Sequence, residues 1–154
     1  MIHAMMARKI PLAAAAAVAG VMLLRPVARA EQWAYAMQTG HGNHSIQVDV
    51  DSIGQQAGYI AARLLYEYHG SAPGPRSALV DGAFDCRANR FQVLSRTEYA
   101  GPQATGAAGA VTRSDLSAAR WKAASADPET FAIIDWVCGV AARKLASPQA
   151  GSMP

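Results

Sequence analysis

The chain has 154 residues, of which 51% are hydrophobic and 16% are charged, with a formal net charge of +3. Four of the 14 basic residues lie in residues 1–30 and all 11 acidic residues lie after them, so residues 31–154 carry ten basic against eleven acidic side chains, a net charge of −1. This balance argues against nucleic-acid binding, and the length suits a single domain with one hydrophobic core.

Residues 1–30 have the three parts of a secretory signal peptide. Basic residues come first, an apolar run of 15 residues covers 10–24, and Ala28 and Ala30 provide a small-residue cleavage site. Because a membrane-spanning helix needs about 20 apolar residues, we expect cleavage rather than an uncleaved anchor, and no membrane span afterwards. No cysteine follows the apolar run at the cleavage site, so we do not expect a lipoprotein. The sequence therefore predicts export, to the periplasm, the medium or the cell surface.

After the signal peptide we expect one domain, residues 31–146, and a disordered tail, residues 147–154. The domain begins with apolar and polar side chains that alternate with a period of two, which is typical of half-buried strands. From Ser45 to Asp51, for example, one face holds Ile and Val and the other holds Ser, Gln and Asp. The predicted strands are residues 32–38, 44–51, 59–69, 77–86 and 91–99, with short extended pieces at 110–113 and 119–122. The first two strands predict a hairpin around a Gly-containing turn.

Residues 59–69 include Ala61 to Leu65, which would suit a helix, but apolar residues at every second position and short flanking turns favour a strand. Residues 101–109 are rich in Gly and Ala and predict a long loop.

The C-terminal part of the domain predicts a helix from Pro128 to about Leu145. Asp127 can cap its free amide groups, and Pro128 fits the first helical position because it lacks the N–H that would be unpaired there. Ser147 and the proline after it end the helix. One face of this helix holds residues that we expect to pack on a sheet: Phe131, Ile134, Cys138, Ala142 and Leu145.

Cys86 and Cys138 are the only two cysteines of the chain. Because reducing buffers are absent outside the cytosol, two cysteines in an exported chain favour a structural disulfide over a metal or redox pair. A disulfide between them would attach the helix to the sheet and stabilise the fold by about 4 kcal/mol.

The opposite side of the predicted helix carries Ile133, Trp136 and Val140, because successive residues turn by about 100°. An outward Trp between Ile and Val is a candidate contact surface for a partner protein or for a second copy of the chain. The alternative is that the loop at 101–109 or the N-terminal segment folds over these residues.

Three residues near the first predicted turn could hold a metal or support acid–base chemistry: His41, His44 and Asp49. Their spacing gives no helical pair of ligands and fixes no third ligand, so solvated turn histidines are the simpler interpretation. We expect Asp49 and Asp51 on the solvated face of their strand, and Ser45 lacks a nucleophile-elbow pattern. We therefore predict no catalytic centre, no metal and no cofactor. A periplasmic enzyme or metal-handling protein that uses the two histidines and Asp49 is kept as the alternative.

A series of residues in a fixed order resembles the pattern of a known family. These residues are Trp33, Val48-Asp49-Val50-Asp51-Ser52-Ile53-Gly54, Phe84-Asp85-Cys86, Tyr99, Trp121, Asp127-Pro128-Glu129-Thr130 and Val137-Cys138. Over roughly residues 32–139 the chain is similar to the bacterial surface-adhesin protein E family. The resemblance implies an α+β fold, an antiparallel sheet of about six strands with a C-terminal helix held on its concave face by the Cys86–Cys138 disulfide.

The resemblance also implies a function. The best-known members of this family are outer-membrane lipoproteins that bind host plasma and extracellular-matrix proteins. We therefore expect an exported, disulfide-stapled binding module that is not an enzyme, with a host matrix or plasma protein or an envelope component as its partner. A structural envelope protein that associates with itself is a second alternative.

Overall fold

The computed structural model describes residues 31–39, 43–70, 73–116 and 120–147. The predicted signal peptide, residues 1–30, lies outside the described residues, as do His41 and residues 148–154 of the predicted tail.

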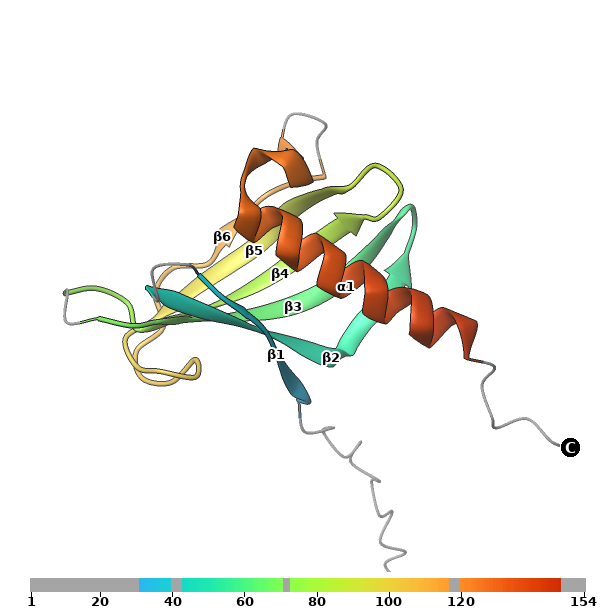
Figure 1. Cartoon of the computed structure of the whole chain (residues 1–154). Helices are drawn as coiled ribbons and strands as arrows, with labels where there is room; N and C mark the ends of the chain where they lie inside the picture. The colour runs from blue at the N-terminus through green and yellow to red at the C-terminus, as the bar shows by residue number, and fades with distance from the viewer. Residues whose placement is uncertain (1–30, 40–42, 71–72, 117–119, 148–154) are drawn as a thin grey trace, which may run out of the picture.

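An antiparallel sheet forms the centre of the fold (Figure 1). Its path runs through six strands in chain order, β1 to β6, and a short β7 pairs with β5 beside β6. The strands are β1 (Trp33–Gln38), β2 (His44–Gln56), β3 (Tyr59–Tyr68), β4 (Ser77–Asp85), β5 (Arg90–Tyr99), β6 (Thr112–Arg113) and β7 (Lys122–Ala123). The predicted α+β architecture is confirmed. Residues 59–69, for which the sequence also allowed a helix, contain strand β3. This strand pairs with β2 and β4 along its length, and the pairing places every second side chain on the same, buried face of the sheet.

A single long helix, α1 (Pro128–Ala146), crosses one face of this sheet after a one-turn 3-10 helix, Ala124–Ala126. Its ends are as predicted. The carboxylate of Asp127 accepts a hydrogen bond from the N–H of Thr130 at 2.8 Å, and Pro128 occupies the first turn. Ser147 has an extended backbone and donates its N–H to the carbonyl of Arg143 at 3.1 Å.

The hydrophobic core lies between α1 and the sheet. The strands contribute alternate residues to it, as expected for a sheet with one covered face. Its fully enclosed members include Ile46, Val48, Leu64, Val80, Phe84 and Val137. The rings of Phe84 and Phe91 lie 4.8 Å apart across β4 and β5. This packing fixes α1 on one face of the sheet, and none of the described residues forms a helix on the other face, which we call the helix-free face.

The helix is rotated about its axis relative to the predicted orientation. Its buried residues are Thr130, Ile133, Ile134, Val137 and Ala141. Ile133 is 1% exposed whereas Phe131 is 59% exposed, so the prediction that Ile133 points outward was wrong, as was the placement of Phe131 and Leu145 against the sheet. Both the predicted and the observed faces have helical spacing, because apolar residues occupy almost every side of α1; the face that packs is the one with Thr130, Ile133, Ile134 and Val137, whose β-branched side chains fill the space over the sheet. At about 100° per residue, Cys138 lies about 80° from the centre of this stripe, so the disulfide reaches α1 from its flank.

Covalent and polar links attach α1 to the sheet. Cys86, which follows β4, forms a disulfide with Cys138, with the Cα atoms 5.7 Å apart, as predicted. Near the start of the helix, Glu129 Oε2 lies 3.0 Å from Nε2 of His44. Near its end, the ammonium of Lys144 contacts two carbonyl oxygens of β2. The links hold both ends and the middle of α1, which makes the helix and the sheet one unit.

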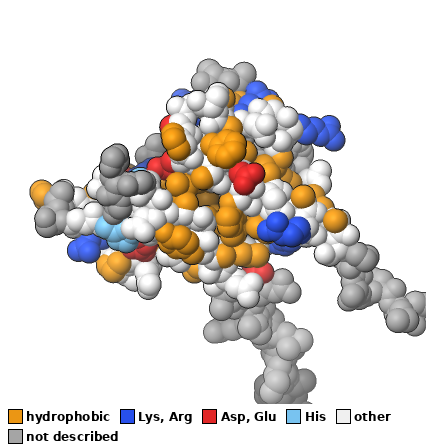
Figure 2. All heavy atoms as spheres, viewed as in Figure 1, with side chains coloured by type: hydrophobic (Ala, Val, Ile, Leu, Met, Phe, Trp, Pro, Cys, Tyr) orange, Lys and Arg blue, Asp and Glu red, His pale blue; other side chains and the backbone are white. Residues whose placement is uncertain are grey.

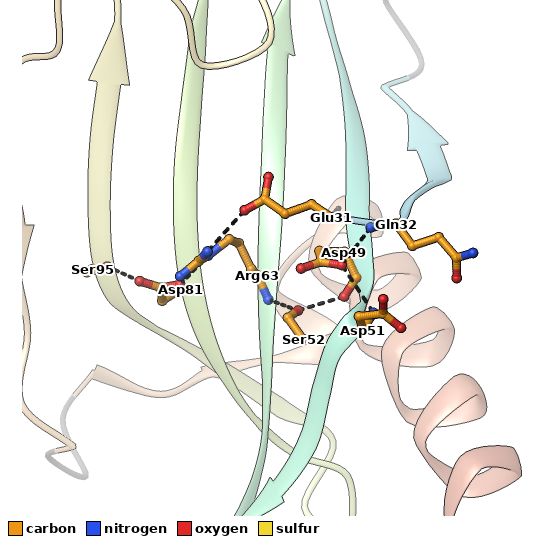
Figure 3. Close-up of polar contacts among 8 residues, drawn as sticks. All are labelled: Glu31, Gln32, Asp49, Asp51, Ser52, Arg63, Asp81 and Ser95. Carbon is orange, nitrogen blue, oxygen red and sulfur yellow. Dashed lines mark hydrogen bonds and ion pairs between the residues drawn. The ribbon is translucent and has the colours of Figure 1, made fainter. Parts of the chain in front are cut away.

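A bulge interrupts β2 at the segment that follows Asp49 (Figure 3). Asp49 pairs with Arg63 and Gly54 pairs with Ala61, so residues 50–53 stand opposite one residue of β3. The hydroxyl of Ser52 bridges the gap: it donates to the carbonyl of Asp49 at 2.6 Å and accepts from the N–H of Arg63 at 2.8 Å. Backbone groups that lose their ladder partner are thereby paired.

Candidate functional site

Of the residues considered for metal binding or catalysis, His44 and Asp49 lie on opposite faces of the sheet. His44 faces α1, where its ring lies 5.8 Å from that of Tyr66 and its Nε2 contacts Glu129. Ser45, the next residue, lies on the opposite face of the sheet, with its hydroxyl 3.1 Å from Nε2 of His69. In the part of the chain that the structure describes, no three His, Cys, Asp or Glu side chains are grouped to hold a metal ion. His41 lies outside that part.

Asp49 was expected on a solvated strand face, and this was wrong. Its side chain is on the helix-free face but only 5% of Asp49 is exposed, because the segment before β1 covers it. Its carboxylate accepts hydrogen bonds from the N–H groups of Gln32 and Asp51, both at 3.1 Å (Figure 3). Asp51 is exposed, as expected. Asp49 therefore fixes the segment before β1 and the bulge of β2, so its carboxylate has a structural role.

The tyrosines near His44 are set up for packing rather than for proton transfer. Burial raises the pKa of Tyr66 well above that of an exposed tyrosine, and Glu129 adds to this, so its phenol stays protonated at neutral pH. Arg96 partly opposes the shift and lies 5.7 Å from the Tyr66 ring. The same guanidinium donates a hydrogen bond to the hydroxyl of Tyr68.

The solvent side of α1 carries apolar side chains on both of its flanks. Trp136 and Val140 are partly buried and pack against the core on one flank. Phe131 and Leu145, which lie on the other flank, are 59% and 60% exposed. Figure 2 views the molecule from this side and shows hydrophobic side chains spread over the helix and the sheet beside it. We call these four residues the helix surface.

On the helix-free face of the sheet, three neighbouring rows of side chains near its middle follow the strand register. The middle row contains Tyr35, Gln47, Leu65, Leu79 and Thr97. The row on one side contains Trp33, Asp49, Arg63, Asp81 and Ser95, and the row on the other side contains Ser45, Glu67, Ser77 and Tyr99. Leu65 is 3% exposed although it does not belong to the core under α1. The middle row is therefore apolar at its centre, between two polar rows.

A cleft with a volume of about 400 Å³ lies in this helix-free face. Its floor is formed by Leu65 and Leu79, and its other lining residues are Glu31, Trp33, Gln47, Gln103 and Ala104. Glu31 and Trp33 come from the start of the domain and form one wall of the cleft. Gln103 and Ala104 come from the loop after β5 and form another wall, so the cleft joins segments that are far apart in the sequence. The arrangement combines an aliphatic floor, one aromatic ring, two amides and one carboxylate.

The loop that forms one wall of the cleft is held by buried polar groups. The N–H of Gln103 donates to the carboxylate of Glu67 at 2.5 Å, and the N–H of Ala104 donates to the hydroxyl of Ser77 at 2.9 Å. Both acceptors are buried, Ser77 completely. The loop thus packs on the helix-free face, so these contacts do not support the alternative that it folds over Trp136.

Sequence reasoning missed the cleft, although one signal was present. Leu64-Leu65 in β3 and Leu79-Val80 in β4 are adjacent apolar pairs, which break the period of two. Because neighbouring residues of a strand point to opposite faces, each pair places an apolar side chain on both sides of the sheet. The long-range contacts that bring Trp33 and Gln103 to the same place carry no such local signal.

Comparison with known proteins identifies one match. The family model described as "Surface-adhesin protein E" matches residues 33–139, which covers every strand and most of α1. No curated protein and no solved structure matches the chain. Among the described helices, none combines the length and apolar character that a membrane crossing requires.

Proposed function

This chain belongs to the surface-adhesin protein E family, and from that premise we propose that it is an exported, non-enzymatic module that binds a protein partner. The family suggests a surface-adhesin-like role. Host extracellular-matrix or plasma proteins and components of the bacterial envelope are the partner classes that we propose.

The observation that carries this proposal is the way α1 is attached. A disulfide between Cys86 and Cys138 forms in oxidising compartments, so it fits an exported or cell-surface protein. The helix stays fixed at several points along its length, which keeps its solvent side in a constant position. A rigid surface loses little conformational entropy on binding, and this favours protein recognition.

We propose the helix surface as the contact region, with Trp136 and Val140 retained from the sequence prediction and Phe131 and Leu145 added because they are more than half exposed. Aromatic residues with a large accessible area are frequent in the energetic centre of protein interfaces. Arg143 and Lys144 lie in the last turn of α1 and would border the contact. Ile133 is excluded because it is buried.

The experiment begins with location. Protease treatment of intact cells should remove the domain if it is displayed on the surface, whereas a periplasmic domain is cleaved only after the outer membrane is permeabilised. The purified exported protein should then be tested on immobilised laminin, fibronectin and plasma proteins, and on an envelope fraction. Binding to one of these that Phe131→Ser weakens at unchanged melting temperature supports the proposal. If the protein binds none of these partners, whether it is displayed on the surface or held in the periplasm, the proposal is contradicted.

A further inference from the structure

We propose that the cleft of the helix-free face is a carbohydrate site, which takes one neutral sugar residue of a glycan. The proposal goes beyond the protein-binding role and does not depend on it, because the cleft and the helix surface lie on different sides of the sheet.

The lining of the cleft matches the chemistry of a sugar ring. A sugar ring has an apolar C–H face and a rim of hydroxyl groups that donate and accept hydrogen bonds. The cleft matches both parts: Trp33, Leu65 and Leu79 offer apolar surface, and an aromatic ring can stack on the C–H face. The amides of Gln47 and Gln103 can each donate and accept, which suits hydroxyl partners. The volume, about 400 Å³, is in the range of small-ligand sites.

The charges on and around the cleft disfavour anionic ligands. Glu31 is the only charged residue that lines the cleft, and its carboxylate contacts the guanidinium of Arg63 at 3.2 Å. Asp49, Glu67 and Asp81 lie nearby on the same face of the sheet, so carboxylates outnumber this one guanidinium and an acidic sugar is disfavoured. A neutral ligand rich in hydroxyl groups meets the two amides of the lining without this repulsion, and hexa-arginine tests the cationic alternative.

The floor of the cleft offers no open backbone to a peptide. An extended peptide gains much of its affinity by adding a strand to an open sheet edge. The floor belongs to β3 and β4, which are central strands with ladders on both sides. In the loop wall, the N–H groups of Gln103 and Ala104 are occupied by Glu67 and Ser77. The floor and the loop wall therefore recognise a ligand through their side chains.

The backbone of the loop wall adopts an uncommon conformation. Gln103 and Ala104 have φ angles of 52° and 54°, which non-glycine residues rarely adopt. They are the central residues of a turn that the N–H of Thr105 closes by donating to the carbonyl of Pro102 at 3.1 Å. The turn is held on the sheet by the carboxylate of Glu67 and the hydroxyl of Ser77, which are both buried, and backbone strain of this kind is concentrated at ligand-binding sites. The structure thus keeps the Gln103 side chain beside the cleft at an energetic cost.

The test is a glycan array probed with the purified exported protein, followed by calorimetric titration of the best ligand. The array should carry neutral glycans (lactose, N-acetyllactosamine, mannobiose and chitobiose) and acidic ones (sialyllactose and heparin oligosaccharides), with hexa-arginine as a separate peptide probe. We expect a neutral glycan to bind with a Kd that Trp33→Leu and Gln103→Ala each raise at least tenfold. Tyr35→Leu is the matched control, because Tyr35 is 58% exposed on the same face of β1 but does not line the cleft.

Trp33→Leu keeps an apolar side chain on the edge strand, and the melting temperature of each variant checks its fold. Gln103→Ala remains informative if Trp33→Leu does not fold. A preference for acidic glycans or for hexa-arginine overturns the proposal, as does the absence of any neutral ligand at 10 mM, roughly the weakest end of specific recognition. The proposal is also overturned if the Trp33→Leu and Gln103→Ala variants bind the glycan as tightly as the unmodified protein does.

Discussion

The ammonium of Lys144, in the last turn of α1, lies 2.9 Å from the carbonyl oxygen of Ile53 in the bulge of β2. The same ammonium lies 2.8 Å from the carbonyl oxygen of Val50. A bulge leaves carbonyl groups without ladder partners, and a cation with three donors can pair with two of them at once. Lys144 therefore connects the C-terminal end of the helix to the most irregular point of the sheet.

Lys144→Met should lower the free energy of unfolding by about 1 kcal/mol, because it removes two hydrogen bonds at a partly exposed site while keeping the aliphatic stem. Arg143→Met is the matched control: it removes a positive charge from the same helical turn and should change stability by less than about 0.5 kcal/mol. Urea unfolding of the two variants measures the difference. Equal effects would show that the charge of the last turn matters and not the contact with the bulge.

The residues of α1 show what the sequence could predict. The cap at Asp127, the proline at the first position and the end at Ser147 are local features, and all were predicted from neighbouring residues alone. The rotation of the helix was not. Apolar residues occupy almost every side of α1, so periodicity did not single out one face, and the side that packs was decided by the shape of the sheet.

The same distinction applies to the candidate sites. The alternation in β2 and β3 predicted the strands, and the cysteine count predicted the disulfide. The burial of Asp49 depends on a segment 17 residues earlier in the chain, Gln32, and the cleft depends on Trp33 meeting Gln103. These contacts are properties of the tertiary fold, which a single sequence does not reveal.

The hydroxyl of Ser52 is the next test of the bulge. Ser52→Ala removes the acceptor of the Arg63 N–H and the donor to the Asp49 carbonyl, so we expect a loss of about 1–3 kcal/mol of stability. Ser125→Ala, at an exposed position of the 3-10 helix, should have little effect. Thermal unfolding followed by circular dichroism gives the comparison. A neutral Ser52→Ala would mean that water replaces the hydroxyl without cost.

The helix cap predicts a specific dependence on pH. The ammonium of Lys122, followed by the N–H of Thr130, lowers the pKa of Asp127 from 3.8 to about 2. A carboxylate with a lowered pKa contributes stability that is present above its unfolded pKa and lost as the pH falls through the folded value. Asp127→Ala should therefore cost about 1 kcal/mol at pH 7, with a difference from the unmodified protein that shrinks between pH 4 and pH 2. Asp135→Ala, in the exposed middle of α1, is the control for the loss of one carboxylate away from the cap and should change stability at pH 7 by less than about 0.5 kcal/mol.

The disulfide predicts a sensitivity to reductant. Thiol labelling of the exported protein should find no free thiol until reductant is added, because Cys86 and Cys138 are both bonded. Cys138→Ser should lower the free energy of unfolding by about 2–5 kcal/mol, and the double variant with Cys86→Ser should cost no more than the single one. Labelling of both cysteines in the native protein would contradict the stapled helix. A much larger loss in the double variant would indicate that each cysteine has a separate packing role.

The last prediction separates the helix surface from the core. Trp136 is partly buried and touches the core, whereas Phe131 is 59% exposed, so the two residues should respond differently to a polar substitution. We expect Phe131→Ser to leave the melting temperature unchanged and Trp136→Glu to lower it by several degrees, because Glu removes part of the packing of Trp136. If the helix surface binds the partner, both variants weaken binding in surface plasmon resonance at a temperature where both are folded. Tyr35→Ser, with a similar exposed aromatic area on the helix-free face, is the control and should bind normally. Binding lost in Tyr35→Ser but kept in Phe131→Ser would move the protein contact to the helix-free face.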